Sequence, residues 1–240
     1  MHISVAHDFL PKSPSVHASI VMDHFGVGFE TGRRELARDL EVPIQPGDVV
    51  AFMGPSGSGK SSLMRAVAAQ LDDVLSLDSL ELGDRILVDG LGQEIGATLS
   101  LLSSCGLGEA PLLLRTPAEL SDGQRYRYRL ALGFARQPHW VVADEFTAAL
   151  DRTLARVIAA NLRKLSKRTG IGCLLATTHE DILDDLQPDV LVRCRLDGPP
   201  DVSRCDVKKK RSVSTTNSPS RPERHATGRT LLGGITAAIN

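Results

Sequence analysis

Short apolar runs alternate along the chain with segments of helical character. Continuous apolar runs are typical of strands buried on both faces of a sheet. They occur at residues 49–53, 140–143, 171–177 and 190–195. Helices are predicted between them, at residues 60–70, 95–104, 121–136 and 152–169. This alternation predicts an α/β fold with a mainly parallel sheet that helices cover on both faces.

Two of the predicted helices have recognisable ends. Ser121 and Asp151 are suitable N-caps, and Gly170 ends the longer helix. Apolar residues recur in each helix with a spacing of three or four, which predicts one buried face. In the longer helix this face contains Leu154, Val157, Ile158, Leu162 and Leu165.

The N-terminal part has a different pattern. Residues 18–29 and 36–44 alternate between apolar and polar side chains around a turn at residues 30–34, which predicts two antiparallel strands. We expect a loosely held lead at residues 1–18, one α/β domain at residues 19–205, and a basic, polar tail at residues 206–240. The tail has few residues to bury, so its composition predicts disorder.

Composition limits the classes of partner and the compartment. The formal net charge of −1 gives no overall attraction to nucleic acid or membranes. The four cysteines form no CxxC pair, which disfavours a zinc site and fits a reducing, cytoplasmic setting. The sequence also has neither a signal peptide pattern nor the roughly 18–20 apolar residues needed to cross a bilayer. We therefore expect a cytoplasmic protein that does not span a membrane by itself.

Residues 54–61 read GPSGSGKS and match the phosphate-loop pattern GxxxxGK[ST] between a predicted strand and a predicted helix. Such a loop points backbone N–H groups at phosphate oxygens, its lysine binds the β- and γ-phosphates, and its last hydroxyl binds Mg²⁺. The sequence therefore predicts that the chain binds a nucleoside triphosphate with Mg²⁺. The residues expected to bind the nucleotide are those of this loop and the serine that follows it: Gly54, Pro55, Ser56, Gly57, Ser58, Gly59, Lys60, Ser61 and Ser62.

Polar residues follow two further apolar strands. Asp144 and Glu145 come directly after residues 140–143, at the strand end where α/β sheets hold ligands. Asp144 is suited to hold Mg²⁺ through a water molecule, beside the Ser61 hydroxyl, and Glu145 is suited to orient or deprotonate the water that attacks the γ-phosphate. His179 follows residues 171–177; a lone histidine is usually a surface residue, but here its ring would lie near the γ-phosphate.

Four segments occur in a fixed order: GPSGSGKS, LSDGQ, VVADE, and AALD followed by TTHE. Together they resemble the nucleotide-binding domain of ATP-binding-cassette (ABC) ATPases, over roughly residues 19–196. The resemblance implies a phosphate-loop NTPase fold of ABC type, with a small antiparallel β-subdomain and a short helical region. It also implies that Glu145, His179 and Lys60 serve ATP hydrolysis. Some segments are similar to a soluble ABC group whose members are sometimes fused to a GNAT-like acetyltransferase domain.

The resemblance explains the second helix start, at LSDGQ. In this family two copies face each other head to tail, and the signature segment of one copy contacts the nucleotide held by the other. It implies that Ser121, Gly123 and Gln124 bind ATP across the interface of a homodimer, again at a helix N-terminus.

The chain departs from the family pattern at three places. Asp122 stands where the signature usually has a second glycine. Gln93 is the candidate for the family's metal-binding glutamine, although it follows a loop. Phe29 is our first choice for the aromatic residue that stacks on adenine, with Phe25 as the second.

Three functions remain open from the sequence. The first is a soluble ABC-type ATPase that drives a conformational cycle in an unknown protein partner. The second is the ATP-binding subunit of a membrane transporter with a separate permease, which the short segment between Lys60 and Ser121 disfavours. The third is a nucleotide-dependent module that binds nucleic acid through the basic run at residues 208–211.

Overall fold

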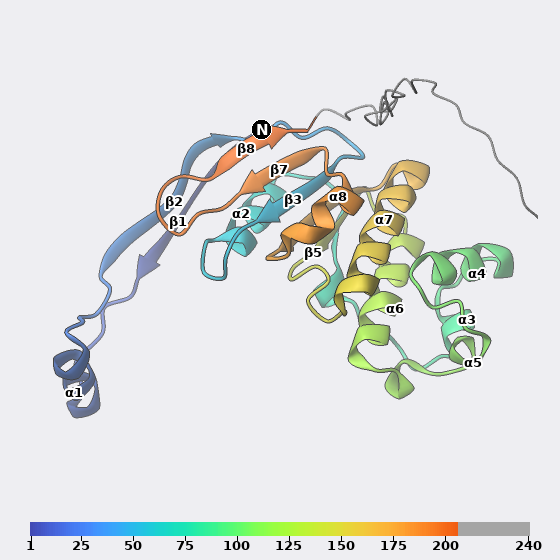
Figure 1. Cartoon of the computed structure of the whole chain (residues 1–240), viewed down its shortest axis with the longest axis horizontal. Coiled ribbons are helices and arrows are strands. Elements are labelled where there is room, and N and C mark those ends of the chain that lie inside the picture. The colour runs from blue at the N-terminus through green and yellow to red at the C-terminus, as the bar shows by residue number, and fades with distance from the viewer. Residues whose placement is uncertain (206–240) are drawn as a thin grey trace, which may run out of the picture. The chain divides into compact units, whose positions relative to one another are not determined.

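A mainly parallel sheet forms the centre of the computed structural model, which describes residues 1–205 (Figure 1). The strand order is β4-β5-β6-β3-β7-β8, and only β8 runs antiparallel to its neighbour. The strands are β3 (Val49–Met53), β4 (Val74–Ser76), β5 (Trp140–Ala143), β6 (Gly172–Thr177), β7 (Val190–Arg193) and β8 (Asp201–Arg204). The predicted α/β fold is confirmed.

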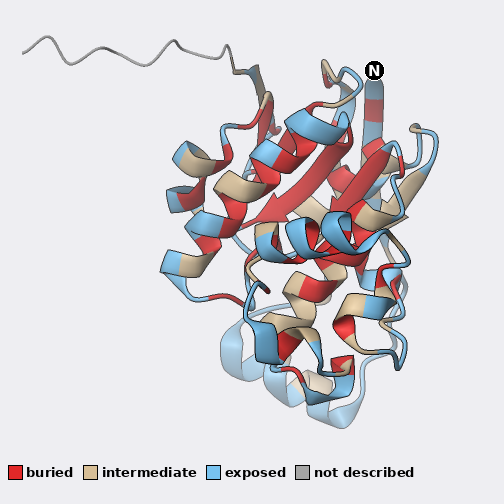
Figure 2. Cartoon of the chain, turned by 90° about the vertical axis from the view of Figure 1, so that its right-hand side faces the viewer, coloured by how far each residue is buried: buried red, intermediate tan, exposed pale blue. Residues whose placement is uncertain are grey.

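Both faces of the sheet are buried, which explains the continuous apolar runs. Val49, Ala51 and Met53 of β3 belong to one core cluster, whereas Val50 and Phe52 point into the other. Helices α6 and α7 complete the first cluster, and α2 with the N-terminal strands completes the second. In Figure 2 the strands are buried between helices whose outer faces are exposed.

Helices follow most of the strands, and residues 1–205 also contain three short 3₁₀ helices. The α-helices are α1 (Val16–Phe25), α2 (Lys60–Ala68), α3 (Leu87–Gly90), α4 (Ile95–Ser104), α5 (Ala110–Leu113), α6 (Asp122–Ala135), α7 (Arg152–Thr169) and α8 (Leu183–Leu186). The 3₁₀ helices are η1 (Leu77–Ser79), η2 (Pro117–Glu119) and η3 (Glu180–Ile182). Ser121 and Asp151 cap α6 and α7 as expected, and Gly170 ends α7. Val157 is an exception to the predicted face, because it is 49% exposed.

The N-terminal prediction is wrong in two respects. The antiparallel partner of β2 (Gly32–Glu41) is β1 (His2–Phe9), which lies in the segment expected to be a loose lead. Residues 16–25 form α1 instead of a strand, at the far end of the β1–β2 ribbon in Figure 1. Ser15 caps this helix, and Gly26 ends it with φ of +64°. Both end signals fit a helix better than a strand.

The described residues belong to one compact unit. The predicted disorder of residues 206–240 falls outside the described part of the chain. The boundary between the domain and the tail therefore stays a prediction. Within residues 1–205, no helix combines the length and hydropathy needed to cross a bilayer.

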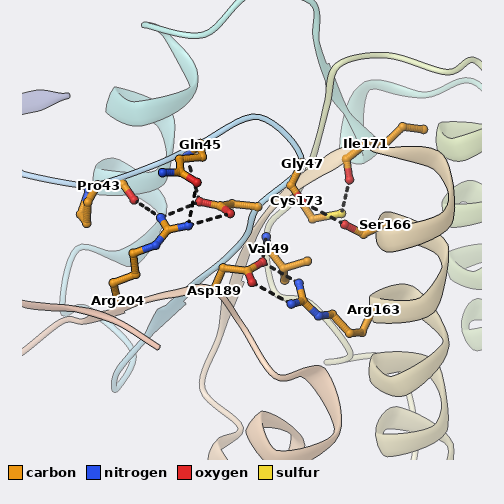
Figure 3. A network of polar contacts seen from close by, with 11 residues as sticks. Pro43, Gln45, Gly47, Val49, Arg163, Ser166, Ile171, Cys173, Asp189 and Arg204 are labelled. Carbon is orange, nitrogen blue, oxygen red and sulfur yellow. Dashed lines mark hydrogen bonds and ion pairs between the residues drawn. The ribbon is translucent and has the colours of Figure 1, made fainter. Parts of the chain in front are cut away.

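A network of ion pairs fixes the strand ends opposite the phosphate loop (Figure 3). Arg163 of α7 donates to both carboxylate oxygens of Asp189, at 2.5 and 2.7 Å, and Arg204 binds Asp48 at 2.9 Å. Desolvation opposes the ionisation of Asp189, but the hydrogen bonds from Arg163 and from the N–H of Val49 outweigh it and lower its pKa. The pair therefore stabilises the fold above pH ~3.9, and this contribution is lost as the pH falls through the lowered pKa.

Arg163→Ala is expected to lower the free energy of unfolding by about 3–5 kcal/mol. The reason is that Asp189, whose side chain is only 17% exposed, would lose its charged partner. Urea unfolding of the variant measures the effect. Arg168→Ala, an exposed position on the same helix, is the control and should change stability by less than about 0.5 kcal/mol. Equal midpoints for the two variants would contradict the prediction.

Candidate active site

The phosphate loop joins β3 to α2 and lies close against neighbouring segments. A Cβ atom on Gly54 would lie 2.3 Å from the carbonyl oxygen of Cys194, so only glycine fits there. Gly59 has φ of +88°, in the left-handed region that favours glycine. A side chain at Gly54 would therefore push the loop away from the sheet.

The N-terminus of α2 is available to an anion. The helix begins at Lys60, and no side chain among residues 1–205 caps it. Its free N–H groups and the partial positive charge of the helix end suit a phosphate group. The Lys60 ammonium group donates to the carbonyl oxygen of Pro55 at 2.9 Å, which places the cation beside the loop.

Three adjacent parallel strands bring the other polar residues to this loop. Strand β6 lies between β3 and β5, so all three end at the same edge of the sheet. The phosphate loop follows β3, Asp144 and Glu145 follow β5, and His179 follows β6 closely. Ligands of open α/β sheets bind at this edge.

Asp144 lies at the centre of the polar contacts. Its Oδ1 accepts hydrogen bonds from the Ser61 hydroxyl at 2.9 Å and from the N–H of Glu145 at 3.1 Å. Its Oδ2 lies 3.4 Å from the Arg65 guanidinium. Glu145 is exposed and has φ of +50°, a conformation that is uncommon for a residue with a side chain. Asp144 is thus anchored, whereas within residues 1–205 no side-chain hydrogen bond or ion pair holds the Glu145 carboxylate.

His179 faces the turn that follows the carboxylates. Its Nδ1 lies 3.5 Å from Oγ1 of Thr147, whose hydroxyl donates to the carbonyl oxygen of Phe146 at 2.6 Å. Because that hydroxyl proton is already used, Nδ1 of His179 is assigned as the donor. Burial and then the nearby Arg152 charge lower the pKa of His179, so the ring is neutral at pH 7.

These residues line one cavity of about 420 Å³. The predicted site residues on its wall are Ser56, Gly57, Gly59, Lys60, Ser61, Ser62, Asp144, Glu145 and His179. Gly54, Pro55 and Ser58 belong to the same loop without lining the cavity. The cavity has room for a phosphate chain between cationic, hydroxyl and carboxylate groups.

The sequence reasoning missed His7 of β1. It lines the same cavity, and its Nε2 lies 2.9 Å from the Ser62 hydroxyl. The available signal was the alternation of Ile3 and Val5 with polar residues, which predicts a strand. Prolines at positions 11 and 14 concealed it, because they favoured an irregular lead.

The helix that carries the LSDGQ segment begins outside this cavity. Ser121 Oγ accepts from the N–H of Gln124 at 3.3 Å, and Gln124 Oε1 accepts from the N–H of Ser121 at 3.0 Å. This reciprocal capping leaves the hydroxyl proton of Ser121 free to donate to another group.

Positions 122 and 123 differ in what they tolerate. A Cβ on Gly123 would lie 3.1 Å from the carbonyl oxygen of Ala149, so α6 packs tightly there on the segment before α7. Asp122 is exposed and pairs with Arg125 of the same helix at 2.9 Å. The structure therefore explains why glycine occupies position 123 while an aspartate fits at 122.

Phe29 and Gln93 do not reach the cavity. Phe29 lies 6.0 Å from the Lys12 ammonium group, whereas Gln93 donates from Nε2 to the carbonyl oxygen of Ala135 at 3.0 Å. Gln93 follows α3, not a strand of the central sheet, and lines a separate surface cavity with Asp89. Their predicted roles in adenine stacking and metal binding are not supported by these positions.

Known proteins with similar sequences are ATP-binding proteins. A family model described as ABC transporter matches residues 37–97. The chain is 32% identical over 199 residues to the taurine import ATP-binding protein TauB of Pseudomonas aeruginosa, covering 70% of this chain and 74% of that protein. It is 27% identical to the lipoprotein-releasing system ATP-binding protein LolD of Novosphingobium aromaticivorans, covering 66% of this chain and 87% of that protein.

Solved structures show the same fold. A dimeric ATP-binding cassette in a post-hydrolysis state, bound to ADP and Pi, superposes with a TM-score of 0.58 at 20% identity, covering 75% of this chain and 95% of that one. CbiO1 of Clostridium perfringens, part of an ABC transporter complex, gives a TM-score of 0.57 at 19% identity, with coverage of 72% and 82%. At these identities the likeness concerns the fold alone.

The parallel sheet, the phosphate loop and the carboxylates at the sheet edge define a phosphate-loop NTPase. The sequence relationship makes the assignment narrower: the chain belongs to the ABC transporter ATPase family, and it is an ATPase of ABC type. The narrower resemblance to the group fused to GNAT-like domains is not supported by these relatives.

Proposed function

We propose that the chain is the ATP-binding subunit of a membrane transporter and hydrolyses Mg-ATP between two copies of itself. The observation that carries the proposal is the cavity that gathers Lys60, Asp144, Glu145 and His179. The similarity over 74% of an import ATP-binding protein supports the choice of transporter.

The donor atoms in the cavity fit Mg-ATP. Ser61 Oγ and Asp144 Oδ1 lie 2.9 Å apart and are the hard oxygen donors that Mg²⁺ takes, together with phosphate oxygens and water. Within residues 1–205, no group of three or more His, Cys, Asp or Glu side chains forms a metal site. Mg²⁺ would therefore enter with the nucleotide, held by Ser61 and Asp144, and neutralise phosphate charge there.

The remaining groups are suited to hydrolysis. The N–H groups of α2 and the Lys60 ammonium bind and orient the phosphates. Glu145, which is not held by an ion pair in the structure described, accepts the proton of the attacking water. Neutral His179, which carries its proton on Nδ1, offers Nε2 as a hydrogen-bond acceptor at the same wall and orients the attacking water.

The position of Ser121 supports a homodimer. Ser121, Gly123 and Gln124 lie outside the cavity of their own chain, and the Ser121 hydroxyl has a proton to donate. In a head-to-tail pair, the N-terminus of α6 from one copy would close the cavity of the other. One chain alone would provide only half of each ATP site.

The relatives favour the second of the three functions that the sequence left open over the first. The taurine and lipoprotein relatives are named as parts of import and release systems, which favours a permease partner and a place at the cytoplasmic face of a membrane. A soluble ATPase with another protein partner is the second candidate. Nucleic-acid binding relied on the basic run at residues 208–211, which lies outside the described residues.

Membrane association in the native cells tests the transporter proposal. Tagged Glu145→Gln protein is purified in mild detergent with ATP, and Lys60→Ala protein serves as the control. We expect an integral membrane protein to co-purify in a fixed ratio with the first variant, and the complex of wild-type protein to hydrolyse ATP. Recovery of active wild-type ATPase only from the soluble fraction, with no membrane protein bound, would contradict the proposal.

A further inference from the structure

We infer that Tyr126 is a positioning residue that couples the helix start at Ser121 to the turn that carries Glu145. The inference rests on the proposed function. Tyr126 lies in α6, five residues after Ser121. Its hydroxyl oxygen accepts a hydrogen bond from the N–H of Thr147 at 3.4 Å, so α6 reaches the turn after β5 directly.

The turn at residues 144–148 is held in an uncommon conformation. Glu145 and Thr147 have φ of +50° and +68°, which residues with side chains adopt at a cost. The N–H of Phe146 donates to the carbonyl oxygen of Ala176 at 2.7 Å, and that of Ala148 donates to Glu145 at 2.9 Å. Surrounding contacts therefore determine where the Glu145 carboxylate lies.

The bond to Tyr126 has no substitute in the described part of the chain. Thr147 is 0% exposed, so water cannot accept its N–H, and Tyr126 provides the acceptor that the structure records. Loss of the hydroxyl would leave a buried donor unpaired inside a strained turn. The turn would then relax, and Glu145 would lose its position relative to the phosphates.

Thr147 extends the connection to His179. Its Oγ1 lies 3.5 Å from Nδ1 of His179, so Tyr126, Thr147 and His179 form one series of polar contacts. In the proposed dimer, Ser121 contacts the nucleotide of the other copy, while Glu145 and His179 serve the nucleotide of their own. Tyr126 would thus make hydrolysis in one site sensitive to the closure of the other.

Tyr126→Phe tests the inference, and Tyr128→Phe is its matched control. Tyr128 is fully buried in the same helix, and its hydroxyl has no hydrogen-bond partner within residues 1–205. We expect Tyr126→Phe to lower kcat about tenfold. Its ATP affinity should match that of Tyr128→Phe, and its Hill coefficient for ATP should fall towards 1, whereas its thermal stability should fall only by the cost of one unpaired buried donor.

Two outcomes would overturn the inference. One is an unchanged kcat and Hill coefficient in Tyr126→Phe. The other is a loss of ATP affinity in proportion to the loss of rate, which indicates a general distortion of the site. Failure of the proposed function looks different, because wild-type protein would then show no cooperative, concentration-dependent ATPase activity.

Discussion

Glu145→Gln is expected to lower the ATPase rate by about 100-fold or more while ATP binding is retained. The amide has nearly the same shape as the carboxylate, but it cannot accept the proton of the attacking water. Glu145 lines the cavity beside the phosphate loop, whereas Asp144 is already bound to Ser61 at 2.9 Å. Phosphate release at saturating ATP measures the rate, and nucleotide titration measures binding.

The control for this substitution is Glu81→Gln, an exposed glutamate outside the cavity. It should retain the wild-type rate. Full activity of Glu145→Gln would remove Glu145 from the role of base. Loss of ATP binding in this variant would show that the carboxylate shapes the site and does not act only in the chemical step.

Lys60→Ala is expected to weaken ATP binding by about 10- to 100-fold, the range for loss of one hydrogen bond to a charged group. Lys60 begins α2 and lies in the cavity wall, with its ammonium group beside the loop. ADP affinity should fall as well, because the lysine also contacts the β-phosphate. Titration with a fluorescent nucleotide measures both affinities.

Lys167→Ala removes the same charge from the exposed last turn of α7 and serves as the control. This comparison separates local phosphate binding from a change in net charge. An unchanged affinity in Lys60→Ala would contradict the phosphate-loop assignment itself.

The sequence predicted the central sheet well because its strands are buried on both faces. Residues such as Val50 and Ala51 face different core clusters, so the run must be apolar throughout. The end signals of α6 and α7 were equally informative, since Ser121 and Asp151 cap them directly. Most of the candidate site follows from these strands, because parallel strands place their ends together.

The N-terminal part was harder to predict from the sequence, because several of its apolar residues are not buried. Val16 and Phe25 of α1 are 77% and 69% exposed, so this helix shows no buried face to recognise. His7 reaches the cavity because β1 pairs with β2 and packs against α2, which are contacts between segments far apart in sequence. Sequence periodicity alone cannot identify such a partner.

Gln93 illustrates the same limit at the metal site. Its side-chain amide offers a suitable oxygen ligand, but Gln93 follows α3 and does not come after a strand of the sheet. The strand that pairs with β5 is β4, which ends earlier, at Ser76. A short edge strand of this kind has little periodicity, and its neighbour is defined by three-dimensional pairing. Sequence periodicity likewise gives no sign that the Tyr126 hydroxyl contacts Thr147.

Sedimentation velocity of the Glu145→Gln protein tests the shared active site most directly. With saturating Mg-ATP the variant should form a dimer, and with ADP it should sediment as a monomer. The double variant Glu145→Gln, Lys60→Ala should sediment as a monomer even in Mg-ATP. A strictly monomeric Glu145→Gln protein in Mg-ATP would contradict the account, provided that wild-type protein hydrolyses ATP with a specific activity independent of its own concentration.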